Sequence, residues 1–241
     1  MKAILLAGGQ GTRLRPLTLN TPKPVVPIFN RPFLTYQIDL IKQVPEIDEV
    51  VLSLNYQPEA IAAVFGDGSA LGTHIRYVVE PEPLGTAGGL AHARPLLKSD
   101  PVLVVNGDTL VDVDLAAFVD AYRAGGAGAA IVCALVAEGG RYGRVELNAA
   151  SSIQRFREKD ASDRSAGWIS AGVYLFSART LDGIAALGRG SLERDVLERQ
   201  PPGSILAFRT DGPFIDIGTP ETLAAIRGGL GGFAAPRGRN R

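Results

Sequence analysis

Along the first half of the chain, short apolar runs alternate with stretches whose apolar residues recur at helical spacing. Continuous apolar runs of this length are typical of strands that are buried on both faces. The predicted strands are residues 3–7, 50–54, 75–79 and 102–105, and the predicted helices are 33–44, 58–65, 87–97 and 115–124. Such alternation predicts a largely parallel sheet with helices on both of its faces.

The second half of the chain changes character. Strand-like runs follow one another with few helical stretches between them, at residues 131–137, 143–147, 153–157 and 168–176. These strands are expected to extend the sheet in antiparallel or mixed fashion, before helical patterns return at 192–199 and 221–227. The predicted fold class is therefore α/β, with a Rossmann-like mixed, mainly parallel sheet flanked by helices.

The length of the chain, 241 residues, suits one large domain with a sizeable core. We expect this domain to span residues 1–227. Residues 228–241 are rich in glycine and end in PRGRNR, which predicts a disordered tail. No internal repeat is apparent, hexapeptide repeats included.

The charge balance argues against whole classes of partner. Lys and Arg number 25 and so do Asp and Glu, and this zero net charge predicts neither nucleic-acid nor membrane-surface binding. One cysteine, Cys133, excludes an intramolecular disulfide and fits a reducing compartment. The first apolar run is too short for a signal peptide or a membrane span, so a cytoplasmic location is expected. A homo-oligomer is compatible with the sequence, which leaves the oligomeric state open.

The segment after the first predicted strand carries the clearest functional signal. Residues 5–24 read LLAGGQGTRLRPLTLNTPKP, with glycines at Gly8, Gly9 and Gly11. Glycines let backbone N–H groups approach an anion without a Cβ in the way. Arg13 and Lys23 add two full positive charges to the same loop. We interpret the segment as a loop that holds a polyphosphate.

This loop differs from two other glycine-rich phosphate loops. Leu14 stands where the dinucleotide-binding fingerprint has its third glycine, and the P-loop ends in Gly-Lys-Ser/Thr. With Arg13 and Pro22-Lys23-Pro24 at this spacing, the segment resembles the signature of the sugar-1-phosphate nucleotidyltransferases. Members of that family join a nucleoside triphosphate to a sugar 1-phosphate and release pyrophosphate. The resemblance covers residues 1–227 and implies a nucleotide-diphospho-sugar transferase type of fold.

The same resemblance implies roles for individual residues. The implied catalytic cations are Arg13, Lys23 and Lys159. The implied nucleotide-binding residues are Leu6, Ala7, Gly8, Gly9, Gly11, Thr12, Arg13, Lys23, Glu80, Pro83, Leu84, Gly85, Thr86, Asn106 and Gly107. The implied sugar-binding residues are Tyr142, Gly143, Glu158, Lys159, Ser170 and Gly172. Two positions depart from the family pattern, because Asp160 replaces a proline and Ser170 replaces an asparagine.

Two aspartates are candidate metal ligands. Asp108 follows a predicted strand in VVNGDT, at the edge where open α/β sheets bind ligands, and Asp216 lies in FIDIGTP. Either one alone could instead cap a helix or turn. As a pair they match the two metal-binding aspartates of the family, and the resemblance implies that they hold Mg²⁺, which prefers such oxygen ligands.

The choice of base is attributed to Glu80. A carboxylate can accept two hydrogen bonds from the N1–H and N2–H₂ edge of guanine, whereas uracil and thymine offer one such donor. The segment Glu80–Ala87 also resembles the PLGTA motif of GDP-sugar pyrophosphorylases. The competing interpretation is a surface glutamate beside prolines.

The substrates implied by the resemblance are GTP and a sugar 1-phosphate. Strings at 31–34, 106–109, 111–115, 141–143, 191–195 and 214–221 are similar to those of D-glycero-α-D-manno-heptose 1-phosphate guanylyltransferases. Alternatives are a mannose-1-phosphate guanylyltransferase and a uridylyltransferase acting on an amino-sugar 1-phosphate. A non-catalytic sugar-nucleotide-binding regulator is a fourth interpretation, which the presence of Arg13, Lys23, Asp108 and Asp216 disfavours.

Overall fold

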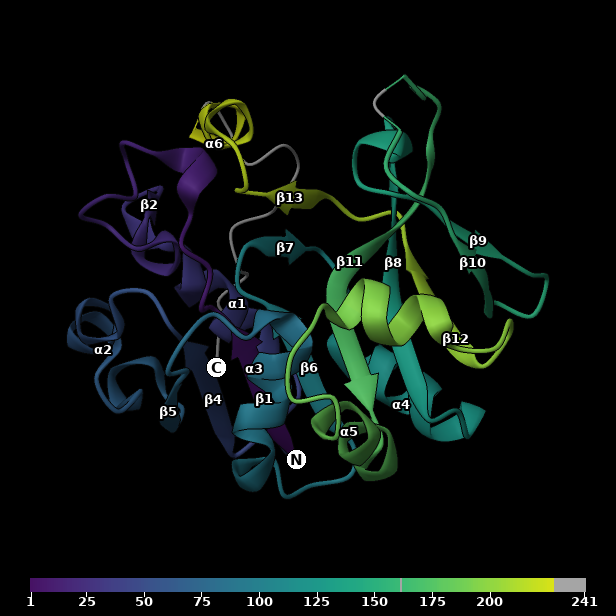
Figure 1. Cartoon of the computed structure of the whole chain (residues 1–241), viewed down its shortest axis with the longest axis horizontal. Helices are drawn as coiled ribbons and strands as arrows, with labels where there is room; N and C mark the ends of the chain where they lie inside the picture. The colour runs from purple at the N-terminus through teal and green to yellow at the C-terminus, as the bar shows by residue number, and fades with distance from the viewer. Residues whose placement is uncertain (161, 228–241) are drawn as a thin grey trace, which may run out of the picture.

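A seven-stranded sheet forms the centre of the protein in the computed structural model, which describes residues 1–160 and 162–227 (Figure 1). Its strands, in spatial order, are β12 (Ile205–Thr210), β8 (Ala129–Val136), β11 (Gly167–Phe176), β6 (Val102–Asn106), β1 (Lys2–Leu6), β4 (Glu49–Leu54) and β5 (Ile75–Val79). Strand β11 runs antiparallel to both of its neighbours, whereas every other adjacent pair is parallel. The predicted mixed, mainly parallel sheet is confirmed.

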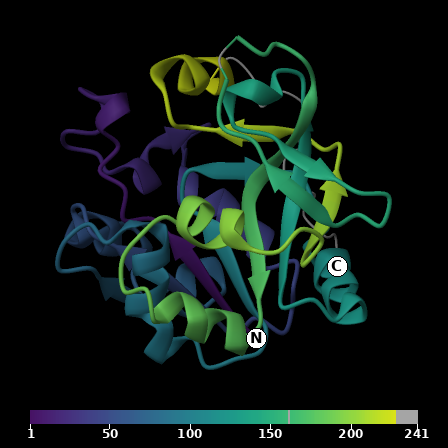
Figure 2. The same ribbon diagram turned by 45° about the vertical axis from the view of Figure 1, so that its right-hand side comes forward.

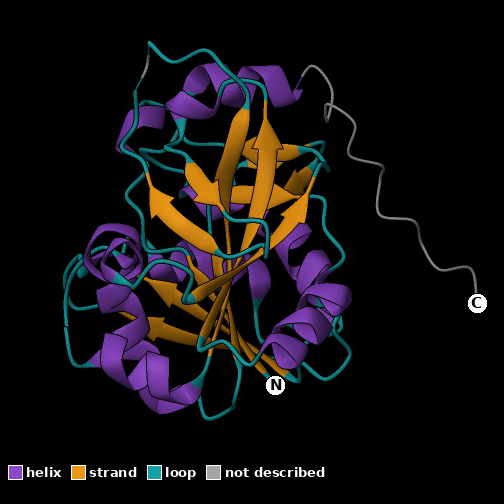
Figure 3. Cartoon of the chain, turned by 90° about the vertical axis from the view of Figure 1, so that its right-hand side faces the viewer, coloured by secondary structure: helices purple, strands orange, loops and turns teal. Residues whose placement is uncertain are grey.

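Helices cover both faces of this sheet, as Figure 3 shows. They are α1 (Phe33–Ile41), α2 (Pro58–Phe65), α3 (Gly85–Ala93), α4 (Leu115–Gly125), α5 (Ala178–Ala185) and α6 (Pro220–Arg227). Alternate strand residues supply two separate cores. In β1, Leu5 packs into the core shared with α1, α2, α4 and α6, while Ile4 faces the core shared with α3 and α5. Among the described residues, no helix is long and apolar enough to cross a membrane.

Three two-stranded ribbons lie outside the central sheet. They pair β2 (Pro27–Ile28) with β3 (Arg31–Pro32), β7 (Thr109–Val111) with β13 (Phe214–Asp216), and β9 (Val145–Leu147) with β10 (Ile153–Phe156). The β7–β13 ribbon and α6 lie over the carboxyl ends of the parallel strands, at the top of Figure 1 and again in Figure 2. This ribbon therefore crosses the edge at which a ligand site was expected.

Several predicted elements need correction. The strands expected at 143–147 and 153–157 do not extend the central sheet but pair with each other as β9 and β10. The strand that pairs with β8 at the edge of the sheet is β12, which the sequence pattern did not indicate. Helix α5 was also missed, although Ser177 caps it by accepting a hydrogen bond from the N–H of Thr180.

Two predicted helices have different limits or forms. The helix expected over 87–97 is α3 followed by the 3₁₀ turn η4 (Arg94–Leu96), because Pro95 lacks the N–H that would continue the α-helix. The helix expected over 192–199 is a π-helical turn, η6 (Leu192–Val196), followed by the 3₁₀ turn η7 (Leu197–Arg199). The tail predicted for 228–241 lies outside the described residues.

Candidate functional site

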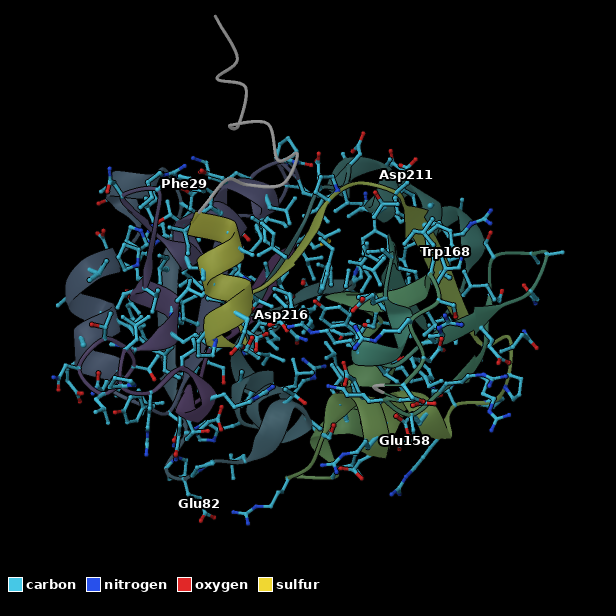
Figure 4. The ribbon with its side chains drawn as sticks, turned by 90° about the horizontal axis from the view of Figure 1, so that it is seen from above. Phe29, Glu82, Glu158, Trp168, Asp211 and Asp216 are labelled. Atoms are coloured by element: carbon cyan, nitrogen blue, oxygen red, sulfur yellow. The ribbon has the colours of Figure 1, made fainter. Side chains whose placement is uncertain are left out.

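A cavity of about 430 Å³ opens at the carboxyl ends of β1 and β6. Of the residues implied to bind nucleotide, all but Leu84 line it, and Asp108 and Gly218 line it as well. The residues implied to bind sugar do not line this cavity. Figure 4 shows Asp216 near the middle of this face and Glu158 closer to the edge of the molecule. The nucleotide and sugar predictions therefore fall in two neighbouring regions.

The glycine loop is fixed from beneath by two buried side chains. Gly11 has a left-handed φ of 60°, and its carbonyl accepts a hydrogen bond of 2.7 Å from the Thr18 hydroxyl. Leu14, in the 3₁₀ turn η1 (Thr12–Leu14), is 2% exposed and anchors the far side of the loop. Arg13 lies between these anchors, is exposed, and lines the cavity. The loop is thus preorganised with its charged side chain on the cavity side.

Asp108 and Asp216 are brought together by backbone pairing. Strand β6 turns through Gly107 and Asp108 into β7, and in the β7–β13 ribbon Asp216 lies opposite Thr109. The N–H of Ile217 donates to the carbonyl of Asp108 over 3.0 Å. A Cβ on Gly107 would lie 2.7 Å from the carbonyl oxygen of Leu6, so only glycine fits at this turn. The predicted pairing of the two aspartates is consistent with this geometry.

The charges at this point are closely balanced. Lys23 Nζ lies 2.8 Å from Asp108 Oδ2, and the Lys23 side chain is only 10% exposed. Burial raises the pKa of Asp216, and the negative charge of Asp108 raises it further, while Lys23 and Arg13 oppose the shift. The Asp216 carboxylate also accepts a hydrogen bond of 2.6 Å from the N–H of Gly218. Two carboxylates that repel each other beside this cavity form an arrangement that a cation would stabilise.

These two carboxylates fit a divalent cation of the magnesium type. Among the residues that the structure describes, no group of three or more His, Cys, Asp or Glu side chains could hold a metal by itself. A cation bound here would complete its coordination with water and substrate oxygens. Mg²⁺ binds in this manner, through one or two carboxylates plus phosphate oxygens.

Some of the residues implied to bind sugar lie beside the Asp108 turn. A Cβ on Gly172, where φ is 76°, would lie 2.6 Å from the hydroxyl of Thr109, so β11 passes directly beside the turn. Tyr142 is half-buried, packs edge-on against Phe214 and lies near enough to Asp216 to sense its charge. Lys159 and Glu158 are exposed on the segment between β10 and β11. Gly172 and Tyr142 thus lie near the aspartate pair, whereas Glu158 and Lys159 lie on an exposed segment.

Tyr174 and Glu193 were not assigned any role from the sequence. Tyr174 is completely buried, and its hydroxyl accepts hydrogen bonds from Ser170 Oγ (3.3 Å) and Asn106 Nδ2 (3.5 Å). Burial raises the pKa of Tyr174, and the negative charge of nearby Glu193 raises it further. Glu193 is accessible to solvent but is surrounded by protein; this desolvation raises its pKa, and nearby Lys159 opposes the shift. Ser170 and Asn106 therefore both contact the buried Tyr174 hydroxyl, and Glu193 lies close enough to affect its pKa.

The position of Glu193 depends on the base side of the cavity. The N–H of Leu192 donates to the Thr86 hydroxyl over 2.8 Å, and the N–H of Ala87 donates to the carbonyl of Gly190 over 2.9 Å. These contacts hold the η6 turn against α3. The only signal in the sequence was the string SLERD at 191–195, which a helical interpretation does not place near the sugar side.

Glu80 is not a surface residue, so that interpretation is wrong. It is 8% exposed and lines the cavity. Its Oε1 accepts a hydrogen bond from Ser53 Oγ (2.9 Å), and its Oε2 accepts one from the N–H of Leu84 (3.1 Å). Each carboxylate oxygen can accept a second hydrogen bond, so a contact to guanine stays a prediction.

Comparison with known proteins identifies relatives over nearly the whole chain. A family model described as nucleotidyl transferase matches residues 2–225. The mannose-1-phosphate guanylyltransferase of Mycobacterium tuberculosis is 38% identical over 229 residues, which make up 94% of this chain and 63% of that protein. The catalytic subunit beta of the Xenopus tropicalis mannose-1-phosphate guanylyltransferase is 38% identical and matches 92% of this chain and 62% of its own length. The chain thus spans less than two thirds of these curated relatives.

Solved structures agree with the fold. The crystal structure of HddC from Yersinia pseudotuberculosis superimposes with a TM-score of 0.82 and 28% identity, covering 94% of this chain and 98% of that one. The same protein complexed with GMP-PN gives a TM-score of 0.80, with the same identity and coverage.

Proposed function

The chain belongs to the nucleotidyl transferase family, and from this membership we propose that it joins GTP to a sugar 1-phosphate, forming a GDP-sugar and pyrophosphate. The observation that carries this proposal is that Asp108 and Lys23 line the glycine-loop cavity as an ion pair, with Asp216 held beside the Asp108 turn by the β7–β13 ribbon. That combination suits a reaction between two phosphate groups. The names of the curated relatives and the GMP-PN complex of HddC support guanine as the base.

The reaction requires positive charge and alignment of the two phosphate groups rather than a general base. A phosphate oxygen of the sugar 1-phosphate forms a bond to the α-phosphorus of GTP, and the bond from that phosphorus to the pyrophosphate oxygen breaks. The attacking oxygen is already anionic at neutral pH, so no side chain needs to remove a proton. The obstacle is repulsion between two anions, which fixed cations and in-line positioning overcome.

Each group of residues has a part in this reaction. Arg13 and the N–H groups of the glycine loop bind the triphosphate, and Lys23 offsets charge beside the α-phosphate. Asp108 and Asp216 would hold the divalent cation, which would supply positive charge to offset the repulsion between the phosphates. Lys159 binds the sugar phosphate. Glu193, which lies near Tyr174 and Lys159, accepts hydrogen bonds from sugar hydroxyls.

For the sugar, we propose a 1-phosphate of manno configuration. The strings quoted from the sequence favour D-glycero-α-D-manno-heptose 1-phosphate. Mannose 1-phosphate is the second candidate, because relatives at 38% identity carry that name. The two sugars share one ring configuration and differ only in the chain beyond C5, so a single hydroxyl-binding arrangement could accept both rings.

A matrix of substrates tests the proposal. Pyrophosphate release is measured with ATP, GTP, CTP and UTP against the 1-phosphates of mannose, D-glycero-D-manno-heptose, glucose and N-acetylglucosamine, in Mg²⁺. We expect the highest kcat/KM with GTP and a manno sugar, and the ratio between the two manno sugars identifies the substrate. A preference for UTP with N-acetylglucosamine 1-phosphate would overturn the proposal. Tight GTP binding without pyrophosphate release would indicate a regulator instead.

A further inference from the structure

Gln37 breaks the apolar pattern of α1. It lies on the face formed by Leu34, Ile38 and Ile41, which are all buried, and it is itself 0% exposed. A buried carboxamide without partners costs about 1–3 kcal/mol, while leucine or methionine has the same helix propensity and no such cost. The presence of glutamine at this position therefore needs a reason other than packing.

The partners of Gln37 supply that reason. Its Nε2 donates to the carbonyl of Asn106 and, over 2.8 Å, to the carbonyl of Thr109. Because both partners can only accept, the NH₂ group must face them and the orientation of the amide is settled. Its Oε1 points the other way and has no hydrogen-bond partner among the described residues. The side chain is thus only half satisfied, and its donors are directed at one feature.

That feature is the turn that carries Asp108. Asn106 and Thr109 are the residues on either side of Gly107-Asp108, so a single amide ties together the two ends of the turn. The turn also makes backbone bonds from Gly107 to Leu6 and from Ile217 to Asp108. On its outer side, Lys23 contacts the Asp108 carboxylate, and the Thr109 hydroxyl and the Asn106 amide reach β11. Gln37 is the side chain that braces it from the core.

We propose that Gln37 is a positioning residue: it holds the Asn106–Thr109 turn so that Asp108 and Asp216 face one cation. This inference rests on the proposed function, in which those two aspartates share a divalent ion. This role also accounts for a glutamine at this position despite its unpartnered Oε1. A half-satisfied amide is less favourable for stability than a methylene chain of the same length. Gln37 touches no substrate, so its effect must pass through the turn.

The test compares Gln37→Met with Ile41→Val. The methionine keeps length and helix propensity but donates no hydrogen bond, whereas Ile41→Val weakens packing of the same helix and leaves the turn alone. The dissociation constant for Mn²⁺ alone is measured by electron paramagnetic resonance, with no turnover involved. Removing a side chain that orients a metal ligand typically weakens metal affinity about 10–100-fold, and we expect this for Gln37→Met. Ile41→Val is expected to stay within about twofold of the parent.

Two further measurements keep the outcomes separate. The dissociation constant for GTP without metal should change by no more than about twofold in Gln37→Met, because the glycine loop is untouched. If Gln37→Met fails to fold, Gln37→Asn serves instead, since its shorter amide cannot reach both carbonyls. Unchanged Mn²⁺ affinity in the folded variant, or equal weakening in Ile41→Val, would overturn the positioning role. A parent protein that binds neither Mn²⁺ nor GTP would count against the proposed function itself.

Discussion

Replacing either aspartate of the pair by asparagine should strongly lower activity, yet only the replacement of Asp108 should lower stability. Asp108→Asn and Asp216→Asn each keep the size of the side chain and remove one negative charge from the cation site. We expect turnover to fall at least about a hundredfold in each, equivalent to about 2.7 kcal/mol of transition-state stabilisation. The double variant should lose less transition-state stabilisation than the sum of the two single losses, because both residues bind one ion.

The stability cost of Asp108→Asn follows from its ion pair. Lys23 is 10% exposed and would lose the charge that lies 2.8 Å from its ammonium group. A hydrogen bond between charged groups contributes about 1.5–3 kcal/mol, and the 42% exposure of the Asp108 side chain reduces this through solvent screening to about 1–2 kcal/mol. For a chain of this length, the melting temperature should fall by about 2–8 °C.

Asp216→Asn should act in the other direction when no metal is bound. Burial and the Asp108 charge raise the pKa of Asp216. A carboxyl group with a raised native pKa contributes stability that is fully present below its unfolded pKa and is lost as the pH rises through the native value. At neutral pH the charge is therefore unfavourable in the metal-free protein. Asparagine removes it and still accepts the hydrogen bond from Gly218, so the melting temperature should stay level or rise.

The assay pairs kinetics with calorimetry. Pyrophosphate release gives kcat/KM, and scanning calorimetry in EDTA gives the melting temperature from pH 4 to pH 8. The advantage of Asp216→Asn over the parent should shrink toward pH 4, where the parent Asp216 becomes protonated. An equal drop in melting temperature for both variants at neutral pH would refute the electrostatic reasoning. Near-normal turnover in either would remove that residue from the site.

Three further predictions concern single substrates. Arg13→Ala should weaken GTP binding, whereas Lys159→Ala should leave GTP binding unchanged and raise the KM for the sugar 1-phosphate. Calorimetry measures the GTP affinity, and equal weakening in the two variants would disprove their separate roles. Glu80→Gln, whose amide can still pair with Ser53 and Leu84, should lower the GTP-to-UTP ratio of kcat/KM about tenfold, as loss of one polar contact costs about 1–3 kcal/mol. An unchanged ratio would leave base choice to backbone groups. Glu193→Ala should raise the sugar-phosphate KM about tenfold with GTP affinity unchanged, through one lost hydrogen bond, and an unaltered KM would exclude that contact.

The phosphate side of the site could be predicted because its residues follow strands directly. Gly8 comes two residues after β1 ends, and Asp108 comes two residues after β6 ends. In a parallel sheet the carboxyl ends of neighbouring strands meet at one edge. Predicting the strands therefore also predicted that these loops lie close together. The chemistry of glycines, arginine and carboxylates then suggested the ligand.

The partners of these residues could not be predicted in the same way. Lys23 and Asp108 are 85 positions apart, and Asp216 reaches them through a ribbon whose β13 strand has only three residues. Periodicity identifies a strand but not its neighbour, since pairing is set by contacts distant in sequence. For this reason β9 and β10 were assigned to the central sheet, and the contact of Ser170 with the buried Tyr174 hydroxyl was missed.

Buried polar side chains mark the supports of this site more reliably than the apolar pattern does. Helical spacing places Gln37 on the same face as Leu34 and Ile41, so a glutamine there conflicts with the pattern of its own helix. Glu80 conflicts with its surroundings likewise, because it is buried beside Ser53 of β4 and Gly89 of α3. Each of these buried polar side chains forms a hydrogen bond with a loop at the cavity. Gln37 binds the Asp108 turn, and Glu80 binds the segment at Leu84. Local sequence preferences are broken at functional sites, so buried polar residues on apolar helix faces are the first candidates for positioning residues.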